Sequence, residues 1–272
     1  MDLGLSGKRA IVTGGSKGIG KAIALELARE GADVAIVART RDDLEKAARE
    51  IEGETKRRIV ALPADVTDKA AVDRMVAEAA ERLGGLHILV NSGSPPGGSA
   101  GATGPIESVV DEDLLHDFDV KYVGALRCAR AAIPHMKRQG WGRIINISGT
   151  NARNAGNLSG GARNGALVHF TKTLAVQLGR FGITVNCVHP GQTRTERTPR
   201  LLAARAAELG LTPEEAEKRD YAPDSPRGNA IGRIVDASEI AYVTAFLASE
   251  KSWAISGELI VATGGAGRSV YY

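Results

Sequence analysis

Residues 13–20 read Thr-Gly-Gly-Ser-Lys-Gly-Ile-Gly, directly after the apolar run Ala10-Ile11-Val12 and at the start of a segment with helical spacing. Glycines at positions 14, 18 and 20 let the chain turn sharply and bring backbone N–H groups close to a bound anion. The N-terminus of the following helix adds roughly half a positive charge. The stretch therefore predicts a strand, a turn and a helix that together bind the phosphates of a nucleotide. Its spacing differs from that of the commonest dinucleotide motif, so a glycine-rich turn with another use is the alternative.

The composition indicates one globular domain of ordinary charge. The chain has 272 residues, of which 43% are apolar, and this is enough for the core of a large α/β domain. The 35 Lys and Arg residues nearly balance the 32 Asp and Glu residues, so the charge gives no reason to expect nucleic-acid or membrane binding.

The cysteines and the hydropathy of the sequence indicate the cellular compartment of the protein. Cys128 and Cys187 fall in predicted elements and lack metal-ligand spacing, which predicts neither a disulfide nor a structural metal. No apolar run approaches the roughly 18 residues of a membrane span, and the first strand begins too early for a signal peptide. We therefore expect a cytoplasmic protein.

Short β-branched runs alternate with longer helical stretches along the chain. This alternation predicts the α/β class, with a seven-stranded parallel sheet, helices on both faces, and a single domain over residues 1–272. The predicted strands are residues 10–13, 34–38, 59–63, 88–91, 144–148, 184–188 and 259–261.

Three irregular segments interrupt the alternation. Residues 94–105 are rich in Gly and Pro and residues 149–165 in Gly and Asn, and both segments follow strands, where ligands of open α/β sheets bind. A plain mobile loop is the alternative for each. Residues 194–229 contain a helical piece, 201–209, and a helix start signal at 212–215, so we expect this segment to form a lid over a substrate.

Five further motifs accompany the glycine-rich loop. They are Ala-Asp-Val-Thr-Asp at 64–68, Leu-Val-Asn-Ser-Gly at 89–93, Gly-Arg-Ile-Ile-Asn-Ile-Ser at 142–148, Asn-Cys-Val-His-Pro-Gly at 186–191 and Gly-Gly at 264–265. In this order and spacing the motifs resemble the short-chain dehydrogenase/reductase family nearly end to end. The resemblance implies one doubly wound Rossmann domain with strand order 3-2-1-4-5-6-7, which binds NAD or NADP across the carboxyl ends of its strands. It also implies a homodimer or homotetramer that packs the helices at 111–137 and 162–180 against their symmetry mates.

The resemblance carries cofactor-binding roles onto this chain position by position. Asp65 and Val66 match the pair that meets the adenine, and residues 190–195 match the segment that holds the nicotinamide carboxamide. Ser-Gly-Ser at 92–94 stands where the family has Asn-Ala-Gly, but the residues stay small and still allow a close approach of the backbone to the cofactor. The implied cofactor-binding residues are Gly14, Ser16, Lys17, Gly18, Ile19, Gly20, Arg39, Asp65, Val66, Asn91, Ser92, Gly93, Pro190, Gly191, Thr193 and Thr195.

Charge at the end of the second predicted strand distinguishes the two cofactors. An acid at this place would accept hydrogen bonds from the adenosine ribose of NAD. This chain has Ala38 followed by Arg39, and Lys17 lies in the glycine-rich loop, so two cations flank the place of a 2′-phosphate. We therefore predict NADP, or NADPH in its reduced form. A solvated charge at Arg39 is the alternative.

The family's catalytic set of Asn, Ser, Tyr and Lys is largely missing. Counted from Phe-Thr-Lys-Thr-Leu-Ala at 170–175, the tyrosine position falls on Gly160 and the lysine position on Asn164. Neither residue transfers a proton at neutral pH. The serine position falls on Gly149, with Ser148 and Thr150 beside it, and the asparagine position falls on Lys121.

Lys121 and Asn164 suggest an exchange, with lysine where the family has asparagine and asparagine where it has lysine. In this interpretation the catalytic residues are Lys121, Ser148 and Asn164, and the Lys121 ammonium donates to a developing alkoxide or binds an anionic group. An ordinary helix lysine that points to solvent is the alternative. Other candidate proton donors, each more simply explained as structural, are Tyr122, His116, His169, Tyr271 and Tyr272.

Arginines near the predicted substrate mouth suggest a small-molecule substrate with an anionic group. Arg153, Arg163, Arg194, Arg197 and Arg200 lie in the Gly/Asn-rich segment or at the start of the predicted lid. Plain surface charge is the alternative, because arginine is common on exposed loops.

Two functions remain in competition. The first is an NADP-dependent oxidoreductase that reduces a carbonyl or an activated double bond with a non-standard proton donor. The second is a nucleotide-binding protein of the same fold without net redox chemistry, either a lyase or isomerase or a module that senses NADP. The retained cofactor motifs favour the first, and the missing Tyr and Lys favour the second.

Overall fold

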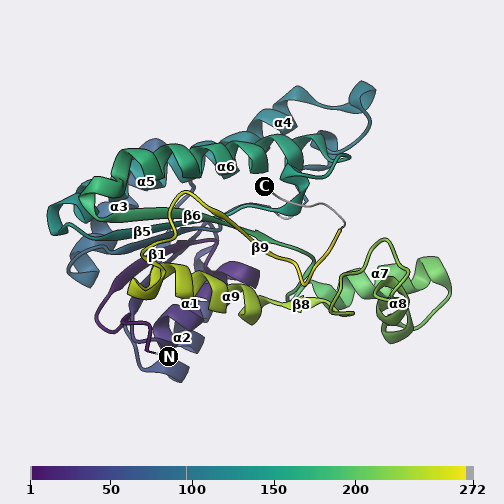
Figure 1. Ribbon diagram of the computed structural model, residues 1–272, viewed down its shortest axis with the longest axis horizontal. Helices are drawn as coiled ribbons and strands as arrows, with labels where there is room; N and C mark the ends of the chain where they lie inside the picture. The colour runs from purple at the N-terminus through teal and green to yellow at the C-terminus, as the bar shows by residue number, and fades with distance from the viewer. Residues whose placement is uncertain (1, 96, 268–272) are drawn as a thin grey trace.

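A parallel sheet of seven strands forms the centre of the computed structural model, which describes residues 2–95 and 97–267 (Figure 1). The strands lie in the order β3-β2-β1-β4-β5-β6-β9, which confirms the predicted fold and strand order, β9 being the seventh strand of the sheet along the chain. Their bounds are β1 Arg9–Thr13, β2 Asp33–Ala38, β3 Ile59–Pro63, β4 Ile88–Asn91, β5 Gly142–Ile147, β6 Ile183–Pro190 and β9 Leu259–Ala262.

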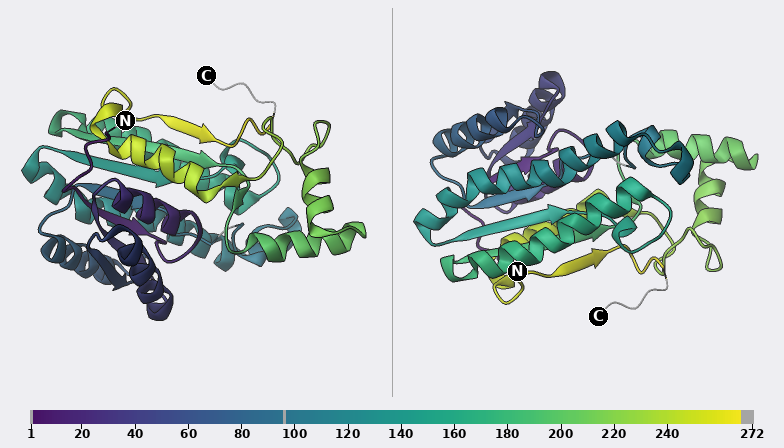
Figure 2. Two further views of the ribbon diagram at one scale, coloured as in Figure 1. Left: turned by 90° about the horizontal axis from the view of Figure 1, so that it is seen from below. Right: turned by 90° about the horizontal axis from the view of Figure 1, so that it is seen from above.

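Helices cover both faces of the sheet (Figures 1 and 2). Because both faces are buried, the strands are apolar almost throughout, and each face has its own cluster of buried aliphatic side chains. The helices on one face are α1 (Gly18–Arg29), α2 (Arg41–Thr55) and α9 (Ala237–Ala248), and those on the other are α3 (Lys69–Leu83), α5 (Gly124–Gln139) and α6 (Leu158–Leu178).

The direction in which the chain adds strands to the sheet reverses at β1, which pairs with β2 on one side and with β4 on the other. Such a reversal opens a crevice at the carboxyl ends of the strands, where open α/β sheets bind ligands. Thr13 ends β1 and Asn91 ends β4, and these two residues lie opposite each other in the register of the sheet. The predicted phosphate loop and the turn after β4 therefore leave the sheet side by side.

The predicted helix over 111–137 is interrupted. Helix α4 (Asp111–Phe118) runs through the π-helical turn η3 (Asp119–Val123) into α5. A π-helical turn inserts one extra residue into the α-helical ladder and is frequent at functional sites. Lys121 lies at its centre. Hydrophobic spacing did not indicate this break, because the apolar residues continue across it.

The predicted irregular segment 149–165 is helical in its second half. Helix α6 begins at Leu158 because the side chain of Asn157 accepts a hydrogen bond from the Gly160 N–H and caps the helix. Positions 160 and 164 therefore lie on a helix and not in a loop. Further short 3₁₀ turns are η1 Ala100–Ala102, η2 Ile106–Ser108, η4 Thr150–Ala152, η5 Gly179–Phe181 and η6 Glu250–Ser252.

The segment predicted as a lid carries two helices that stand away from the sheet at its carboxyl end (Figures 1 and 2). Helix α7 (Thr198–Leu209) begins three residues before the predicted piece, and α8 (Pro213–Asp220) begins with a reciprocal capping box between Thr212 and Glu215. A two-stranded ladder of β7 (Thr193–Arg194) and β8 (Val235–Asp236) joins the ends of the segment. Strands of two residues carry no periodicity, so the sequence did not predict them.

Cys128 and Cys187 are free thiols, and both are buried. Among the helices of the described chain, none is both long enough and apolar enough for a membrane crossing. The described residues also hold no group of three or more His, Cys, Asp and Glu side chains suited to a metal ion.

Candidate active site

The loop between β1 and α1 turns sharply at glycines that no other residue could replace. Gly14 has φ +69°, and a Cβ on this residue would lie 2.7 Å from the carbonyl oxygen of Ser92, so only glycine fits where the two loops meet. A Cβ on Gly20 would clash with the carbonyl oxygen of Gly14. Helix α1 begins at Gly18 without a hydrogen bond from the side chain of its N-cap residue, Lys17, and the Gly18 N–H donates to Glu196 Oε2 at 3.0 Å.

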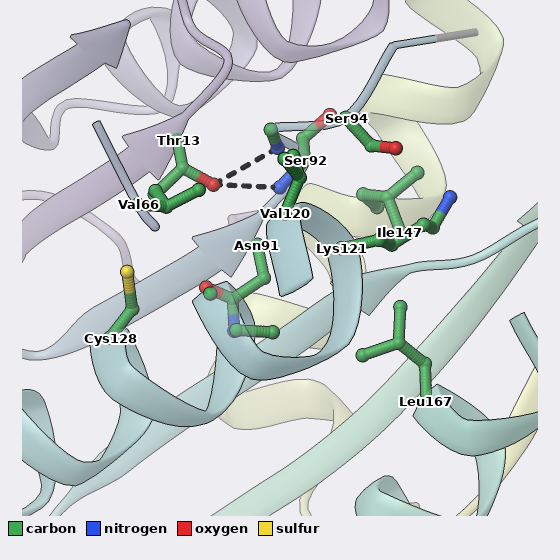
Figure 3. A pocket seen from close by; sticks show the side chains of 13 residues that line it. Thr13, Val66, Asn91, Ser92, Ser94, Val120, Lys121, Cys128, Ile147 and Leu167 are labelled. Atoms are coloured by element: carbon green, nitrogen blue, oxygen red, sulfur yellow. Dashed lines mark hydrogen bonds between the residues drawn. The ribbon is translucent and has the colours of Figure 1, made fainter. Parts of the chain in front are cut away.

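Thr13 joins this loop to the turn after β4. Its Oγ1 accepts hydrogen bonds from the N–H groups of Ser92 and Gly93, both at 3.0 Å (Figure 3). Asn91 Nδ2 donates to Asn146 Oδ1 at 2.9 Å on the neighbouring strand. These bonds fix the backbone of the small-residue turn, which supports its predicted close approach to a cofactor.

The predicted adenine end is polar and partly exposed. Arg39 is exposed at the end of β2, and within the described chain it forms no ion pair. Lys17 Nζ donates to Asp43 Oδ2 at 2.6 Å. Burial raises the pKa of Asp65, but hydrogen bonds from Thr67 outweigh burial and hold that pKa below its ordinary value, so Asp65 is an anion at neutral pH.

Residues 190–195 continue β6 along the opening of the crevice. Gly191 packs against Thr263, since a Cβ there would lie 3.1 Å from the Thr263 Cα. Thr193 Oγ1 donates to the Gly191 carbonyl at 3.0 Å. The methyl group of Thr195 lies 3.5 Å from the Cβ position of Gly18, so the predicted nicotinamide segment reaches the phosphate loop.

Gly160, the predicted tyrosine position, packs closely against two asparagine side chains. A Cβ on Gly160 would lie 2.5 Å from Asn151 Nδ2 and 3.0 Å from the Cγ of Asn157. Gly149 lies beside Asn164, since a Cβ on Gly149 would lie 2.9 Å from Asn164 Nδ2. Gly149 therefore leaves space for the Asn164 side chain.

Lys121, Ser148 and Asn164 come together at the end of β5. Lys121 Nζ donates to the Ser148 carbonyl at 3.2 Å, and Ser148 Oγ donates to the Asn164 carbonyl at 3.0 Å. The Asn164 side chain is 5% exposed, and its Oδ1 has no hydrogen-bond partner among the described residues. The side chain of Lys121 points into the crevice and not to bulk solvent, and the exchange with Asn164 stays a prediction.

A small pocket lies in front of this group, between the ends of β1, β4 and β5 and the turn η3. Lys121 lines it together with Asn91, Ser94, Ile147 and Leu167 (Figure 3). Burial lowers the pKa of Lys121 to about 7, and the nearby guanidinium of Arg163 acts in the same direction. The amine therefore exchanges its proton in the range in which enzymes commonly work.

This shift predicts a pH dependence of stability. In the unfolded chain Lys121 keeps its ordinary pKa of 10.5, while in the folded protein its pKa is about 7. Between these values the unfolded chain holds a proton that the folded protein lacks, so rising pH stabilises the fold. We expect the free energy of unfolding of the wild type to rise from pH 7 to about pH 10 relative to Lys121→Met, as measured by urea denaturation. Parallel pH profiles of the two proteins would contradict a buried, titrating amine.

Sequence reasoning missed a buried carboxylate beside the pocket. Asp117, on α4, is fully buried and accepts hydrogen bonds from Ser159 Oγ at 2.5 Å and from the N–H and Oγ of Ser99, each at 2.9 Å. Arg163 faces it, and the Arg163 Nη1 donates to Ser94 Oγ at 2.9 Å. Asp117 thus ties the Gly/Pro-rich loop at 94–105 to α6. Asp117 is one of several acidic residues in α4, so the sequence did not indicate that it is buried.

We expect Asp117→Asn to destabilise the protein by about 1 to 2 kcal/mol, because the amide leaves Arg163 without its counter-charge and one hydroxyl without an acceptor. Urea denaturation at neutral pH measures the loss. Asp111→Asn is the matched control, since Asp111 is exposed at the start of the same helix. Equal stability of the two variants would show that the buried network contributes nothing.

Two of the five arginines expected at the substrate mouth are engaged within the protein. Arg163 is buried against the loop at 94–105, and Arg194 forms ion pairs with Glu217 and Asp236. The Arg200 side chain is exposed. Fewer arginine side chains than the sequence suggested are therefore available to bind an anionic substrate.

The other candidate proton donors are placed as follows. Tyr122 packs between the rings of Phe118 and Phe170, and His116 and His169 are exposed. Tyr271 and Tyr272 lie outside the described residues. Within the described chain these placements put no phenol of this group at the pocket.

His189 is a second residue that the sequence did not single out. Its Nδ1 accepts a hydrogen bond from the Gly149 N–H at 3.1 Å, so Nε2 carries the proton of the neutral ring. Burial lowers the pKa of His189 to about 4, with smaller contributions from Arg153 and Lys121. The ring is thus neutral at physiological pH and serves to hold the backbone of Gly149 beside Asn164.

Known proteins share this fold over nearly the whole chain. A sequence model of the family described as short chain dehydrogenase matches residues 8–206. The short-chain reductase protein NovJ of Streptomyces niveus is 35% identical over 94% of this chain and 92% of that protein. The NADPH-dependent reductase BacG of Bacillus subtilis is 30% identical over 98% of this chain and 100% of that protein. A crystal structure of L-sorbose reductase from Gluconobacter frateurii, complexed with NADPH and L-sorbose, has a TM-score of 0.91 at 30% identity and covers 99% of this chain and 100% of its own.

Proposed function

The chain belongs to the short-chain dehydrogenase family, and from this premise we propose that it is an NADP-dependent oxidoreductase that reduces a carbonyl or an activated double bond with Lys121 as its proton donor. The observation that carries the proposal is the position of the Lys121 amine, which donates to the Ser148 carbonyl at 3.2 Å inside the crevice. The position that the resemblance gives to tyrosine is Gly160, which has no proton to donate, so an acid from another element is needed.

The choice of NADP rests on charge at the end of β2. Arg39 follows this strand without an acid beside it, and Lys17 lies in the adjacent loop. Two cations at this place suit a 2′-phosphate. The names of similar proteins agree, since BacG is called an NADPH-dependent reductase and the sorbose reductase structure holds NADPH.

The residues present fit a bound dinucleotide. The N-terminus of α1, which has no cap from its N-cap residue Lys17, and the glycines at 14, 18 and 20 suit a diphosphate, and the turn at 92–93 leaves space for close backbone contact. Bound at this edge of the sheet, the cofactor would supply the hydride. We assign its adenine end to Arg39, Asp65 and Val66 and its nicotinamide end to residues 190–195.

Lys121 then provides the charge and the proton. In its ammonium form it would donate to the oxygen on which negative charge develops, and it would be replenished from solvent through the pocket. Asn164 and the hydroxyl of Ser148 would hold the amine and the substrate oxygen within hydrogen-bond distance of each other. Because the pKa of Lys121 is about 7, we expect activity to fall as pH rises through that value.

An activated double bond suits this donor better than a simple ketone. Hydride addition to such a bond leaves an enolate, which is less basic than the alkoxide formed from a ketone. An enolate oxygen is therefore stabilised by a hydrogen bond without full proton transfer, and the carbon is later protonated by water. A carbonyl remains within the proposal because positioning beside the cofactor gives much of the rate advantage.

The proposal is tested by following NADPH absorbance with a panel of ketones, enones, quinones and acidic analogues of each. Consumption of NADPH with any of them supports a reductase, and a preference for the acidic analogues supports an anionic substrate. Tight binding of NADPH without consumption across the panel would instead favour a lyase, an isomerase or an NADP-sensing module.

We further propose a cytoplasmic homodimer or homotetramer. Helix α6 exposes Val176, and the turn after it exposes Phe181, so this side of the protein has apolar surface suited to a symmetry mate. Sedimentation as a monomer would contradict the assembly.

A further inference from the structure

A carboxylate of the protein lies on the phosphate loop. The backbone N–H of Gly18 donates to Glu196 Oε2 at 3.0 Å. Gly18 is the first residue of α1, which has no side-chain cap at its N-cap residue, Lys17. The Glu196 carboxylate therefore takes up a donor at the N-terminus of α1 that a bound diphosphate would otherwise use.

The backbone before α7 presents Glu196 to this loop. Thr195 and Thr198 close a short turn, in which the Thr195 N–H donates to Thr198 Oγ1 at 2.9 Å and the Thr198 N–H donates to the Thr195 carbonyl at 3.0 Å. The Thr195 methyl group also lies against Gly18. Glu196 projects from this turn, and no cation of the described residues lies within ion-pair distance of it. Its interaction there is with the helix N-terminus.

A second acid occupies a second donor of the same loop. Lys17 Nζ is paired with Asp43 Oδ2 at 2.6 Å. Both the backbone donor at Gly18 and the cation at Lys17 thus interact with carboxylates of the chain itself. A dinucleotide phosphate would have to replace Glu196 at the Gly18 N–H, which is a single donor, whereas the Lys17 ammonium has three donors and can bind a phosphate beside Asp43.

We propose that Glu196 is an autoinhibitory latch, in which its carboxylate stands in for the cofactor diphosphate and holds the start of α7 against the phosphate loop until the cofactor displaces it. The inference rests on the proposed binding of NADP(H) at this loop. Displacement frees the turn at 195–198, from which α7 and the rest of segment 194–229 continue. Loading of the cofactor and release of the lid helices become one event.

Glu196→Gln tests the latch with little change of shape. The neutral amide oxygen binds the Gly18 N–H more weakly than a carboxylate does, so we expect NADPH to bind about five- to tenfold more tightly in calorimetric titration. Glu214→Gln is the matched control, because Glu214 is an exposed acid of the same segment, in the first turn of α8. It should leave the affinity unchanged. If both variants bind NADPH more tightly by the same factor, the effect comes from the change in net charge and the latch is overturned.

The ligand offers a second control. Adenosine 2′-monophosphate carries the 2′-phosphate but no diphosphate, so it leaves Glu196 in place, and Glu196→Gln should not change its affinity. Hydrogen exchange of the backbone amides in α7 gives an independent readout. It should rise when NADPH is added to the wild type and should already be raised in cofactor-free Glu196→Gln.

The outcomes separate the latch from the proposed function. If neither protein binds NADPH, the proposed function fails and the latch fails with it. If both proteins bind NADPH equally well, or if exchange in α7 does not respond to NADPH, the latch alone is overturned.

Discussion

Replacing Lys121 with methionine is expected to lower kcat for NADPH-dependent reduction about 10³-fold. A positioned general acid contributes roughly 10²- to 10⁴-fold to a rate, and within the described residues no phenol of the predicted group lies at the pocket to take over. Methionine keeps the length and apolar stem of the side chain but removes the charge and the donor. NADPH consumption with the best substrate of the panel measures the loss, and calorimetry shows whether NADPH still binds. An unchanged kcat would rule out Lys121 as the donor.

The exchange of Lys121 and Asn164 can be tested by reversing it. The single variants Lys121→Asn and Asn164→Lys each disturb the group around Ser148, the first by removing the amine and the second by adding another. In the double variant the amine returns to the position that the family gives it. We expect the double variant to be more active than Lys121→Asn alone, since residues that act as a unit show strong coupling. Additive losses would mean that the two residues do not form one catalytic unit.

The sheet could be predicted because its signals are local and repeated. Each strand is a short run of β-branched residues, and the register puts Thr13 beside Asn91 as the reversal of strand order at β1 requires. The strand, glycine turn and helix at the start of the chain could be predicted for a similar reason. The glycines at 14 and 20 are fixed by close contacts that any side chain would break.

The proposed catalytic group could be predicted only in part from the sequence. Counting from neighbouring motifs led to Lys121 and Asn164, and both lie at Ser148 in the structure. The sequence could not show that position 160 is crowded by Asn151, because that contact depends on how the loop at 149–157 folds back on α6. Predicting the segment 149–165 as irregular was wrong from Leu158 onward, since Asn157 was not recognised as a helix cap.

Contacts between distant charged residues were the hardest to foresee. Asp117 and Arg163 are 46 positions apart, and Gly18 and Glu196 are 178 apart. The sequence around each of these residues does not indicate with which distant residue it interacts. Such pairs depend on how loops cross the carboxyl end of the sheet, and the sequence gives only the order in which those loops occur.

Reversing the charge at the end of β2 should change the cofactor. In Arg39→Asp we expect NADPH to bind about 10²-fold more weakly, because a guanidinium–phosphate contact is lost and a carboxylate repels the 2′-phosphate. The new carboxylate would also accept hydrogen bonds from the ribose hydroxyls of NADH, so NADH should bind more tightly than it does to the wild type. Fluorescence titration with both nucleotides measures the two affinities.

Arg41→Asp is the control for Arg39→Asp. Arg41 is exposed, begins α2 two residues further on, and lies 3.6 Å from Glu45 in an ion pair. The same change of charge there should alter NADPH affinity only slightly, since exposed charges are screened by salt. An unchanged NADPH affinity in Arg39→Asp, or a wild type that binds NADH tenfold more tightly than NADPH, would mean that Arg39 is a solvated charge. Lys17 would then be left in its pair with Asp43, and the cofactor would be NAD.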